Sequence, residues 1–392
     1  MNLSIQEKNQ KLSTSEIIQL LCLYFVACTH YIDGLITIAL YIVLPLGFLL
    51  SLRDYHKSQM NKTFRSLMWL YGWVLFCTLL STNIGASLIE LKKIAGCVLS
   101  SFMMLSLAKD LKRVYLLYLT FLLFLISTWQ YALGHIYEVV DISSAQLNDQ
   151  KLNANTFAYF TTYATFAIYM LGYLKNKYTW LFEMLFPLTL LLSFITAIYS
   201  ASRQLLIIQI PFILLLLANR YNFRSGKGLM LFIGIIAIAI AGYFYFGETM
   251  FANSYLSKRA EMSIEDDTRI VIANECIQIG TENPLFGIGP GCVAKHVSTG
   301  NFSHNTYLEL FAGTGLVGMI IFIIMIYSFI CAQLRRYRET HDTVFMAFVI
   351  FGMIWAIDQI FYVFHTDLWL ISFFILVATH SEVYNKTKYG IR

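Results

Sequence analysis

The sequence predicts an all-α polytopic membrane protein with about twelve transmembrane helices and one large outward-facing loop. Of the 392 residues, 58% are hydrophobic and only 13% are charged, and the mean hydropathy is +0.63. Soluble domains carry about a quarter charged residues. We therefore expect the chain, over 1–392, to form a single integral membrane domain rather than a soluble protein with an anchor.

The predicted spans follow from apolar runs separated by polar connections. A helix of about 20 mostly apolar residues crosses a bilayer. The runs occur at roughly 17–30, 35–52, 66–82, 95–108, 114–133, 157–174, 179–199, 204–218, 229–246, 314–333, 343–357 and 367–380. No internal repeat is visible, which argues against the transporter folds that are built from duplicated halves.

The distribution of Lys and Arg predicts the orientation of the chain. Most of the 28 basic residues fall in alternate connections, such as 53–65, 109–113, 220–227 and 335–338. Cytoplasmic connections carry the excess of basic residues, so we expect both termini in the cytoplasm. The net charge of +5 is explained in this way and does not indicate nucleic-acid binding. The long polar stretch 247–313, here called the late polar segment, then lies outside the membrane between the ninth and tenth spans.

Short amphipathic helices are expected within the late polar segment. Asp267 or Thr268 would cap a helix running to about Ile279. Its apolar side would be formed by Ile270, Ile272, Ala273, Cys276 and Ile277. The acidic run 265–267 favours helix capping; metal binding is the alternative, although no full set of oxygen ligands can be identified.

A turn-rich connection follows this helix, over 283–291. Gly287, Gly289 and Gly291 could present backbone N–H groups to a phosphate, but spaced glycines more often permit unusual backbone geometry. Cys276 and Cys292 flank this connection and could form a disulfide in an oxidising compartment.

Two arginines are candidate anion-binding groups. Arg203 lies between two apolar runs that are joined by almost nothing, so it is placed at the outer end of a tight helical hairpin. An arginine is unusual on the outward side, which favours anion binding over anchoring at the interface. Arg269 opens the predicted helix of the late polar segment, where a local salt bridge to the acidic run is the alternative.

Three further residues could take part in binding or proton transfer. His304 is followed by Asn305 and by the helix that enters the membrane, and histidine exchanges protons near neutral pH. Asp358 ends an apolar run, where a carboxylate is costly unless it is paired. It is a candidate partner for an arginine or for His304; a solvated carboxylate at the membrane interface is the alternative.

The order of these motifs resembles the O-antigen ligase and O-antigen polymerase superfamily of bacterial membrane glycosyltransferases. The resemblance rests on AIYSASRQ around Arg203, on TRIVIANECIQIGTENPLFGIGPG, and on SHNTYLELFAGTGLVG. It covers most of the chain from about Asn153 onward.

The resemblance implies a metal-independent, cofactor-free enzyme of the bacterial inner membrane whose active site faces the periplasm. Its donor would be a glycan on undecaprenyl pyrophosphate and its acceptor the lipid A–core oligosaccharide, with membrane lipids as surroundings. Arg203 and Arg269 match the arginines that hold the pyrophosphate, and His304 matches the residue that activates the acceptor hydroxyl. Asn305 and Asp358 are assigned to substrate binding.

We favour an O-antigen ligase. The alternative is a polymerase of the same superfamily, for O-antigen, capsule or exopolysaccharide. A protein O-oligosaccharyltransferase, a transporter of lipid-linked glycans and a scaffold protein are less favoured. A scaffold protein, in particular, would not need Arg203, Arg269 and His304 on one side of the membrane.

Overall fold

The computed structural model describes residues 11–55, 60–136, 154–174, 179–200, 205–221, 268–364 and 368–390. These residues form helices and no strand, which confirms the all-α class. The predicted span 229–246, Arg203 and the first part of the late polar segment, 247–267, lie outside the described residues.

Each predicted apolar run within the described residues falls in a helix. The elements are α2 (Thr14–Thr29), α3 (Leu35–Ile38), η1 (Ala39–Val43), α4 (Leu44–Asp54), α5 (Lys62–Leu79), α6 (Ile84–Leu107), α7 (Leu111–Ile136), α8 (Ala154–Tyr173), α9 (Thr179–Ser200), η3 (Leu205–Gln209), α10 (Ile210–Arg220), α14 (Thr268–Glu282), α15 (Val293–His296), α16 (Thr306–Thr340), α17 (Thr343–Asp358) and α18 (Leu368–Tyr389).

Three of these stretches are long and apolar enough to cross a membrane. They are Leu35–Asp54, Leu111–Tyr131 and Thr306–Thr340. Shorter apolar helices include Thr14–Thr29, Ile207–Arg220 and Thr343–Asp358. The described structure thus has the helices of a membrane protein, while the number of crossings and the orientation remain predictions.

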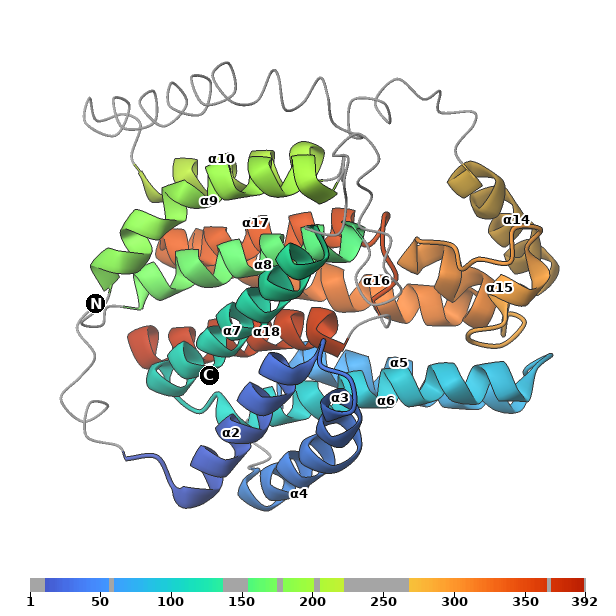
Figure 1. Cartoon of the computed structure of the whole chain (residues 1–392), viewed down its shortest axis with the longest axis horizontal. Coiled ribbons are helices and arrows are strands. Elements are labelled where there is room, and N and C mark those ends of the chain that lie inside the picture. Colours follow the sequence, from blue (N-terminus) through green and yellow to red (C-terminus); the bar gives the residue numbers. More distant parts are fainter. Residues whose placement is uncertain are drawn as a thin grey trace.

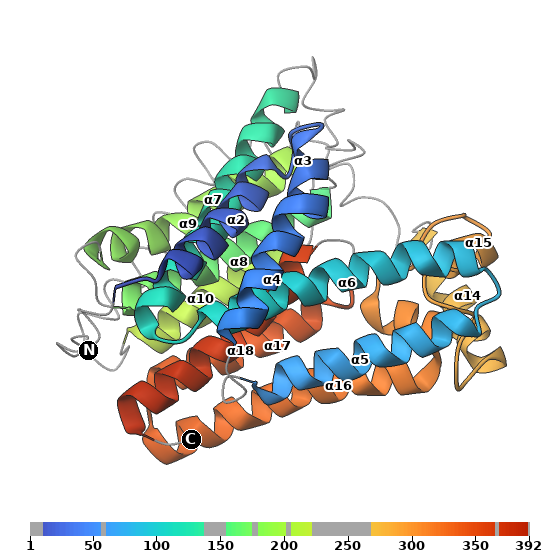
Figure 2. The ribbon, with the colours of Figure 1, turned by 90° about the horizontal axis from the view of Figure 1, so that it is seen from below.

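Three helices extend together to one side of the molecule and carry the late polar segment at their end. Figure 2 shows α5, α6 and α16 running beside one another, with α14 and α15 at the far end. α16 packs against α5, α14 and α17, and α18 packs against α6. Most of the other helices gather on the opposite side, namely α2, α4, α7, α8, α9 and α10 (Figures 1 and 2).

Aromatic rings form the centre of the bundle. Trp355 of α17 stacks on Phe374 of α18 with ring centroids 4.2 Å apart, and Phe121 of α7 meets Phe373 edge-on at 4.5 Å. Trp355 and Trp369 are fully buried. Offset and edge-to-face contacts of this kind add to the stabilisation from burial, so α17 and α18 are fixed where they approach the functional region.

Two wide helical turns each precede a proline. The π-helical turn η1 ends two residues before Pro45. The second π-helical turn, η3, ends two residues before Pro211. Proline has no N–H group, and its ring collides with the carbonyl four residues earlier. Widening the turn relieves that collision, so both helices continue through their prolines.

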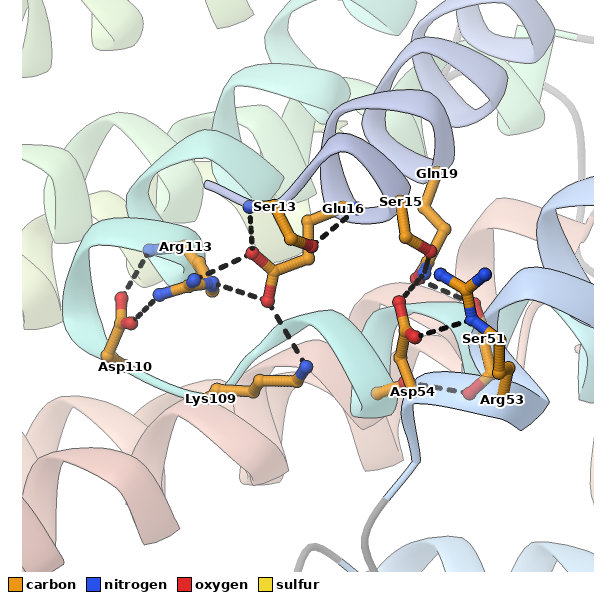
Figure 3. Close-up of polar contacts among 11 residues, drawn as sticks. Ser13, Ser15, Glu16, Gln19, Ser51, Arg53, Asp54, Lys109, Asp110 and Arg113 are labelled. Atoms are coloured by element: carbon orange, nitrogen blue, oxygen red, sulfur yellow. Dashed lines mark hydrogen bonds and ion pairs between the residues drawn. The ribbon is translucent and has the colours of Figure 1, made fainter. Parts of the chain in front are cut away.

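A buried ionic network joins the start of α2 to the turn between α6 and α7 (Figure 3). The carboxylate of Glu16 accepts hydrogen bonds from Arg113 at 2.7 Å, from Lys109 at 3.1 Å and from the Ser13 N–H at 2.9 Å. Arg113 also pairs with Asp110. Because each charge has partners, the network holds the start of α2 against the turn between α6 and α7.

Candidate functional site

The late polar segment is held against a break in α16. Gly315 has φ 72° and ψ −176°, a conformation essentially restricted to glycine, and it interrupts the helix. The backbone groups freed by the break bond instead to the connection 283–291: the Leu316 N–H donates to the Pro284 carbonyl at 2.8 Å, and the Ile288 N–H donates to the Ala312 carbonyl at 2.9 Å.

Two more carbonyls at the break have partners. The Gly289 N–H donates to the Gly313 carbonyl at 3.0 Å, and Trp73 of α5 donates its indole N–H to the Thr314 carbonyl at 2.9 Å. Non-helical backbone is tolerated at membrane depth only where its polar groups are satisfied within the protein. The break in α16 therefore provides the backbone groups to which the late polar segment is hydrogen-bonded.

The glycines of the connection serve this docking. Gly287, Gly289 and Gly291 all have positive φ, and a Cβ on Gly287 would overlap the backbone at Gly313. The N–H groups of Gly287 and Gly289 donate to the carbonyls of Asn283 and Gly313. These contacts confirm the interpretation of the glycines as permitting backbone geometry, since two of the three N–H groups are already engaged.

His304 stands on a tightly bonded turn just before α16. Its φ of 52° lies in the left-handed region, which is uncommon for a residue other than glycine. On one side, Ser303 donates its hydroxyl to the Asn305 carbonyl at 2.8 Å and its backbone N–H to the Glu309 carboxylate at 2.9 Å. The imidazole lies 4.1 Å from the Phe302 ring, centroid to centroid. The turn thus presents His304 in one defined backbone conformation.

Asn305 caps α16. Its side-chain oxygen accepts the N–H groups of Tyr307 at 2.9 Å and Leu308 at 3.1 Å. This is the usual role of asparagine at a helix N-terminus. The predicted contact of Asn305 with substrate remains a prediction, and the cap is a structural role that the sequence-based interpretation did not assign.

The next residue joins the His304 turn to the turn after α17. The Thr306 N–H donates to the Gln359 carbonyl at 2.8 Å, and the Thr306 hydroxyl donates to the Tyr362 carbonyl at 2.7 Å. Both Thr306 and Gln359 are fully buried. Asp358, directly before Gln359, is thereby placed in the same neighbourhood as His304.

Asp358 is buried at the C-terminal end of α17, with 1% of its surface exposed. The alternative of a solvated interface carboxylate is therefore wrong. Tyr163 of α8 lies close enough to interact electrostatically with it. A carboxylate in such surroundings is costly to bury, which fits a binding or positioning role better than anchoring.

Arg269 lies in the first turn of α14, which runs from Thr268 to Glu282 and so extends beyond the predicted end at Ile279. Ile272 and Cys276, three and seven residues further on, are buried with Ala312 of α16. Helical spacing puts Arg269 on this same face, and its side chain is half-buried.

The predicted apolar side of α14 is only partly correct. Ile272 and Cys276 are buried against α16, but Ile270 and Ile277 are 40% and 46% exposed. The buried positions 272, 276 and 280 follow one another at a helical spacing of four, and Ile270 and Ile277 lie off this line.

α14 and α16 pack with their N-terminal ends on the same side. Along α14, Cys276 interacts with Glu309, then Gly280 packs on Phe311, and beyond its end Pro284 bonds to Leu316. Contacts that advance in the same direction along both helices place Arg269 and the His304 turn at one end of the pair.

The described residues approach Arg203 from both sides. α9 is described as far as Ser200 and η3 from Leu205, so the predicted hairpin connection itself lies outside the described residues. Gln209 of η3 donates to Thr165 at 2.8 Å and to Ser193 at 3.2 Å, so the start of α10 is tied to α8 and α9. Arg203 itself lies outside the described residues.

The cysteines do not form the disulfide considered from the sequence. All seven are free, and both Cys276 and Cys292 are fully buried. Cys276 packs in the cluster between α14 and α16, and the Cys292 sulfur lies 3.2 Å from the Ser81 hydroxyl. Within the described residues, no group of three or more metal-ligating side chains comes together; metal independence remains a prediction.

Comparison with known proteins gives one family match. No curated protein matches the chain. Residues 188–323 match the family described as O-antigen ligase, a stretch that covers the later part of α9, then η3, α10, α14, α15 and the first half of α16. The match includes Arg203, Arg269 and His304, and it ends before Asp358. This match, which spans less than half of the chain, supports a relationship to the O-antigen ligase superfamily.

Proposed function

We propose that this protein is an O-antigen ligase, which transfers a glycan from undecaprenyl pyrophosphate to the lipid A–core oligosaccharide. The observation that carries the proposal is the shared end of α14 and α16, where Arg269 and the His304 turn lie. The N-termini of both helices also favour negative charge at this end. The family match supports ligase or polymerase chemistry in general.

The reaction needs an anion site and a base. The acceptor hydroxyl loses its proton to an imidazole nitrogen of His304 while its oxygen bonds to the anomeric carbon of the donor sugar. The bond from that carbon to the pyrophosphate oxygen breaks, and the charge develops on the leaving pyrophosphate. Guanidinium groups stabilise such charge in bidentate fashion, which is the role we assign to Arg269 and Arg203.

Buried Asp358 is assigned to the same site. It precedes Gln359, which is bonded to Thr306 of the helix that begins at the His304 turn. A carboxylate there can orient an imidazole and stabilise its protonated form. Asn305 completes the proposed set of substrate-binding residues.

The proposed setting is the bacterial inner membrane, with both termini in the cytoplasm and this site facing the periplasm. The positive-inside distribution of Lys and Arg supports that orientation. The carrier's lipid tail then lies among the apolar helices, with its pyrophosphate at the outer interface. No metal or cofactor takes part in the proposed step.

A polymerase of the same superfamily is the second candidate, because the same residues would pass the glycan to another carrier-linked repeat unit. The glycan profile of cells separates the two. Cells that produce His304→Ala or Arg203→Ala at normal protein level should attach no polymer to lipid A–core. Unchanged attachment in both variants would contradict the residue roles. Loss of chain elongation, with attachment of single repeats intact, would instead identify a polymerase.

A further inference from the structure

Glu309 is a buried carboxylate that the proposed reaction does not use. It lies in the first turn of α16, and 6% of its surface is exposed. Burying a carboxylate is unfavourable unless hydrogen bonds or opposite charges compensate. The N-terminal position on a long helix supplies part of that compensation, but it does not explain why the side chain points inward.

The hydrogen bond of Glu309 explains its orientation. Its Oε2 accepts the backbone N–H of Ser303 at 2.9 Å, across six positions of the chain. Ser303 is held on its other side as well, because its hydroxyl accepts the Asn305 N–H at 3.2 Å and donates to the Asn305 carbonyl. His304 is the one residue between these two anchored positions.

The groups around Glu309 come from two other helices. Lys93 of α6 attracts the Glu309 carboxylate and Glu90 of α6 repels it, while Glu90 and Lys93 form an ion pair with each other at 3.1 Å. Cys276 of α14 lies close enough to interact with Glu309 electrostatically. The carboxylate therefore lies where α6 and α14 approach the beginning of α16, and its hydrogen bond to Ser303 joins the His304 turn to this region.

A left-handed backbone at His304 needs such an anchor. A residue other than glycine in this region costs on the order of 1–2 kcal/mol, so an isolated turn would relax toward other conformations. The cap by Asn305 fixes the beginning of α16 but acts after His304. The bond from Ser303 to Glu309 fixes the chain before His304.

We propose that Glu309 is a positioning residue for His304: its carboxylate holds the turn so that the imidazole meets the acceptor hydroxyl. This inference rests on the proposed function. It assigns no proton transfer to Glu309, because its carboxylate bonds to the backbone of the turn. An uncharged side chain of the same shape that accepts the Ser303 N–H would hold the turn equally well.

Three variants of the full-length protein test the proposal in cells, at matched protein level. Glu309→Ala removes the acceptor and should lower glycan transfer roughly 10- to 100-fold, because a small displacement of a reacting group has effects of that size. Glu309→Gln keeps an oxygen for the Ser303 N–H and should restore most of the transfer. Glu275→Ala is the control, since Glu275 accepts the Ser298 N–H at 3.0 Å in the same segment but away from His304; transfer should be unchanged.

A binding measurement separates positioning from general damage. The purified protein in detergent is titrated with undecaprenyl pyrophosphate, the probe for the donor site. Glu309→Ala should leave the Kd unchanged, because the proposed pyrophosphate ligands are arginines outside the turn. Weaker binding would show general damage to the donor site, which contradicts a role limited to positioning His304. If Glu309→Ala does not accumulate, Glu309→Met, which fills the space without an acceptor, takes its place.

The outcomes distinguish this inference from the proposed function. Normal transfer by Glu309→Ala beside an inactive His304→Ala overturns the role of Glu309 and leaves the function standing. Equal losses in Glu309→Gln and Glu309→Ala show that the charge itself is needed, which also overturns positioning. Normal transfer by His304→Ala contradicts the proposed function whatever Glu309 does.

Discussion

The backbone N–H of Thr306 donates to the carbonyl of Gln359 across 2.8 Å, and this bond joins two segments that are distant in the chain. Thr306 begins α16 just after the His304 turn, and Gln359 follows Asp358 at the end of α17. Both residues are buried. The bond therefore holds the segment of the proposed base, His304, beside the segment of the candidate carboxylate, Asp358.

The Thr306 hydroxyl should be needed for this junction. It donates to the Tyr362 carbonyl at 2.7 Å and accepts the Phe364 N–H at 3.0 Å. Thr306→Val keeps the shape and leaves both backbone groups without this partner, so we expect a loss of about 1–3 kcal/mol in stability. Thermal unfolding in detergent measures it. Thr281→Val, at an exposed position of α14, is the control, and an equal shift in both variants would argue against the junction.

The break in α16 should not accept a side chain. Gly315→Ala places a Cβ in overlap with the Leu285 carbonyl and forces a glycine-only conformation, which alone costs about 1–3 kcal/mol. We expect a lower unfolding temperature and faster proteolysis of the late polar segment. Gly72→Ala, in α5 with open space around it, should be neutral or slightly stabilising. A Gly315→Ala protein as stable as the wild type would show that the break is dispensable.

The network in Figure 3 should make stability depend on acidic pH. Glu16 precedes the apolar run of α2. Burial acts to raise its pKa, but hydrogen bonds from Arg113, Ser13 and Lys109 outweigh burial and lower that pKa from 4.5 to about 2. A pKa that is lower in the folded state gives stability that is full above pH 4.5 and is lost as the pH falls toward 2.

Glu16→Gln tests this dependence. At neutral pH it should lower stability by on the order of 3 kcal/mol, because buried Arg113 loses a partner. The difference from the wild type should shrink as the pH falls from 4.5 toward 2, as followed by the unfolding temperature. Glu282→Gln, at an exposed position of α14, serves as the control. A difference that stays constant over this range would contradict the assignment.

The sequence was sufficient to predict the helices among the described residues, because they depend on local patterns, whereas the roles of the candidate residues stay predictions. Apolar runs mark the helices, and a short link at Arg203 was predicted because few residues separate the two apolar runs on either side of it. The helix of Arg269 was predicted from its acidic cap. What could not be predicted was which side chains of α14 face inward, because that depends on how α14 packs against α16, where Ile272 and Cys276 are buried.

The contacts that form the site also could not be predicted from the sequence. The bond from Thr306 to Gln359, the indole N–H of Trp73 at the Thr314 carbonyl and the anchor at Glu309 all join residues by tertiary packing, with no periodicity to reveal them. Gly315 could be noticed only as one glycine among several, since its role follows from the carbonyls that the break sets free.

The most direct measurement of the central claim is transfer by the purified, full-length protein in lipid vesicles. The donor is a glycan on undecaprenyl pyrophosphate, and the acceptor is radiolabelled lipid A–core. We expect the wild type to convert the acceptor to a larger product and His304→Ala to form no detectable product while still binding undecaprenyl pyrophosphate. Arg269→Ala should lose both binding and product. Product formation by His304→Ala at the wild-type rate would contradict the account.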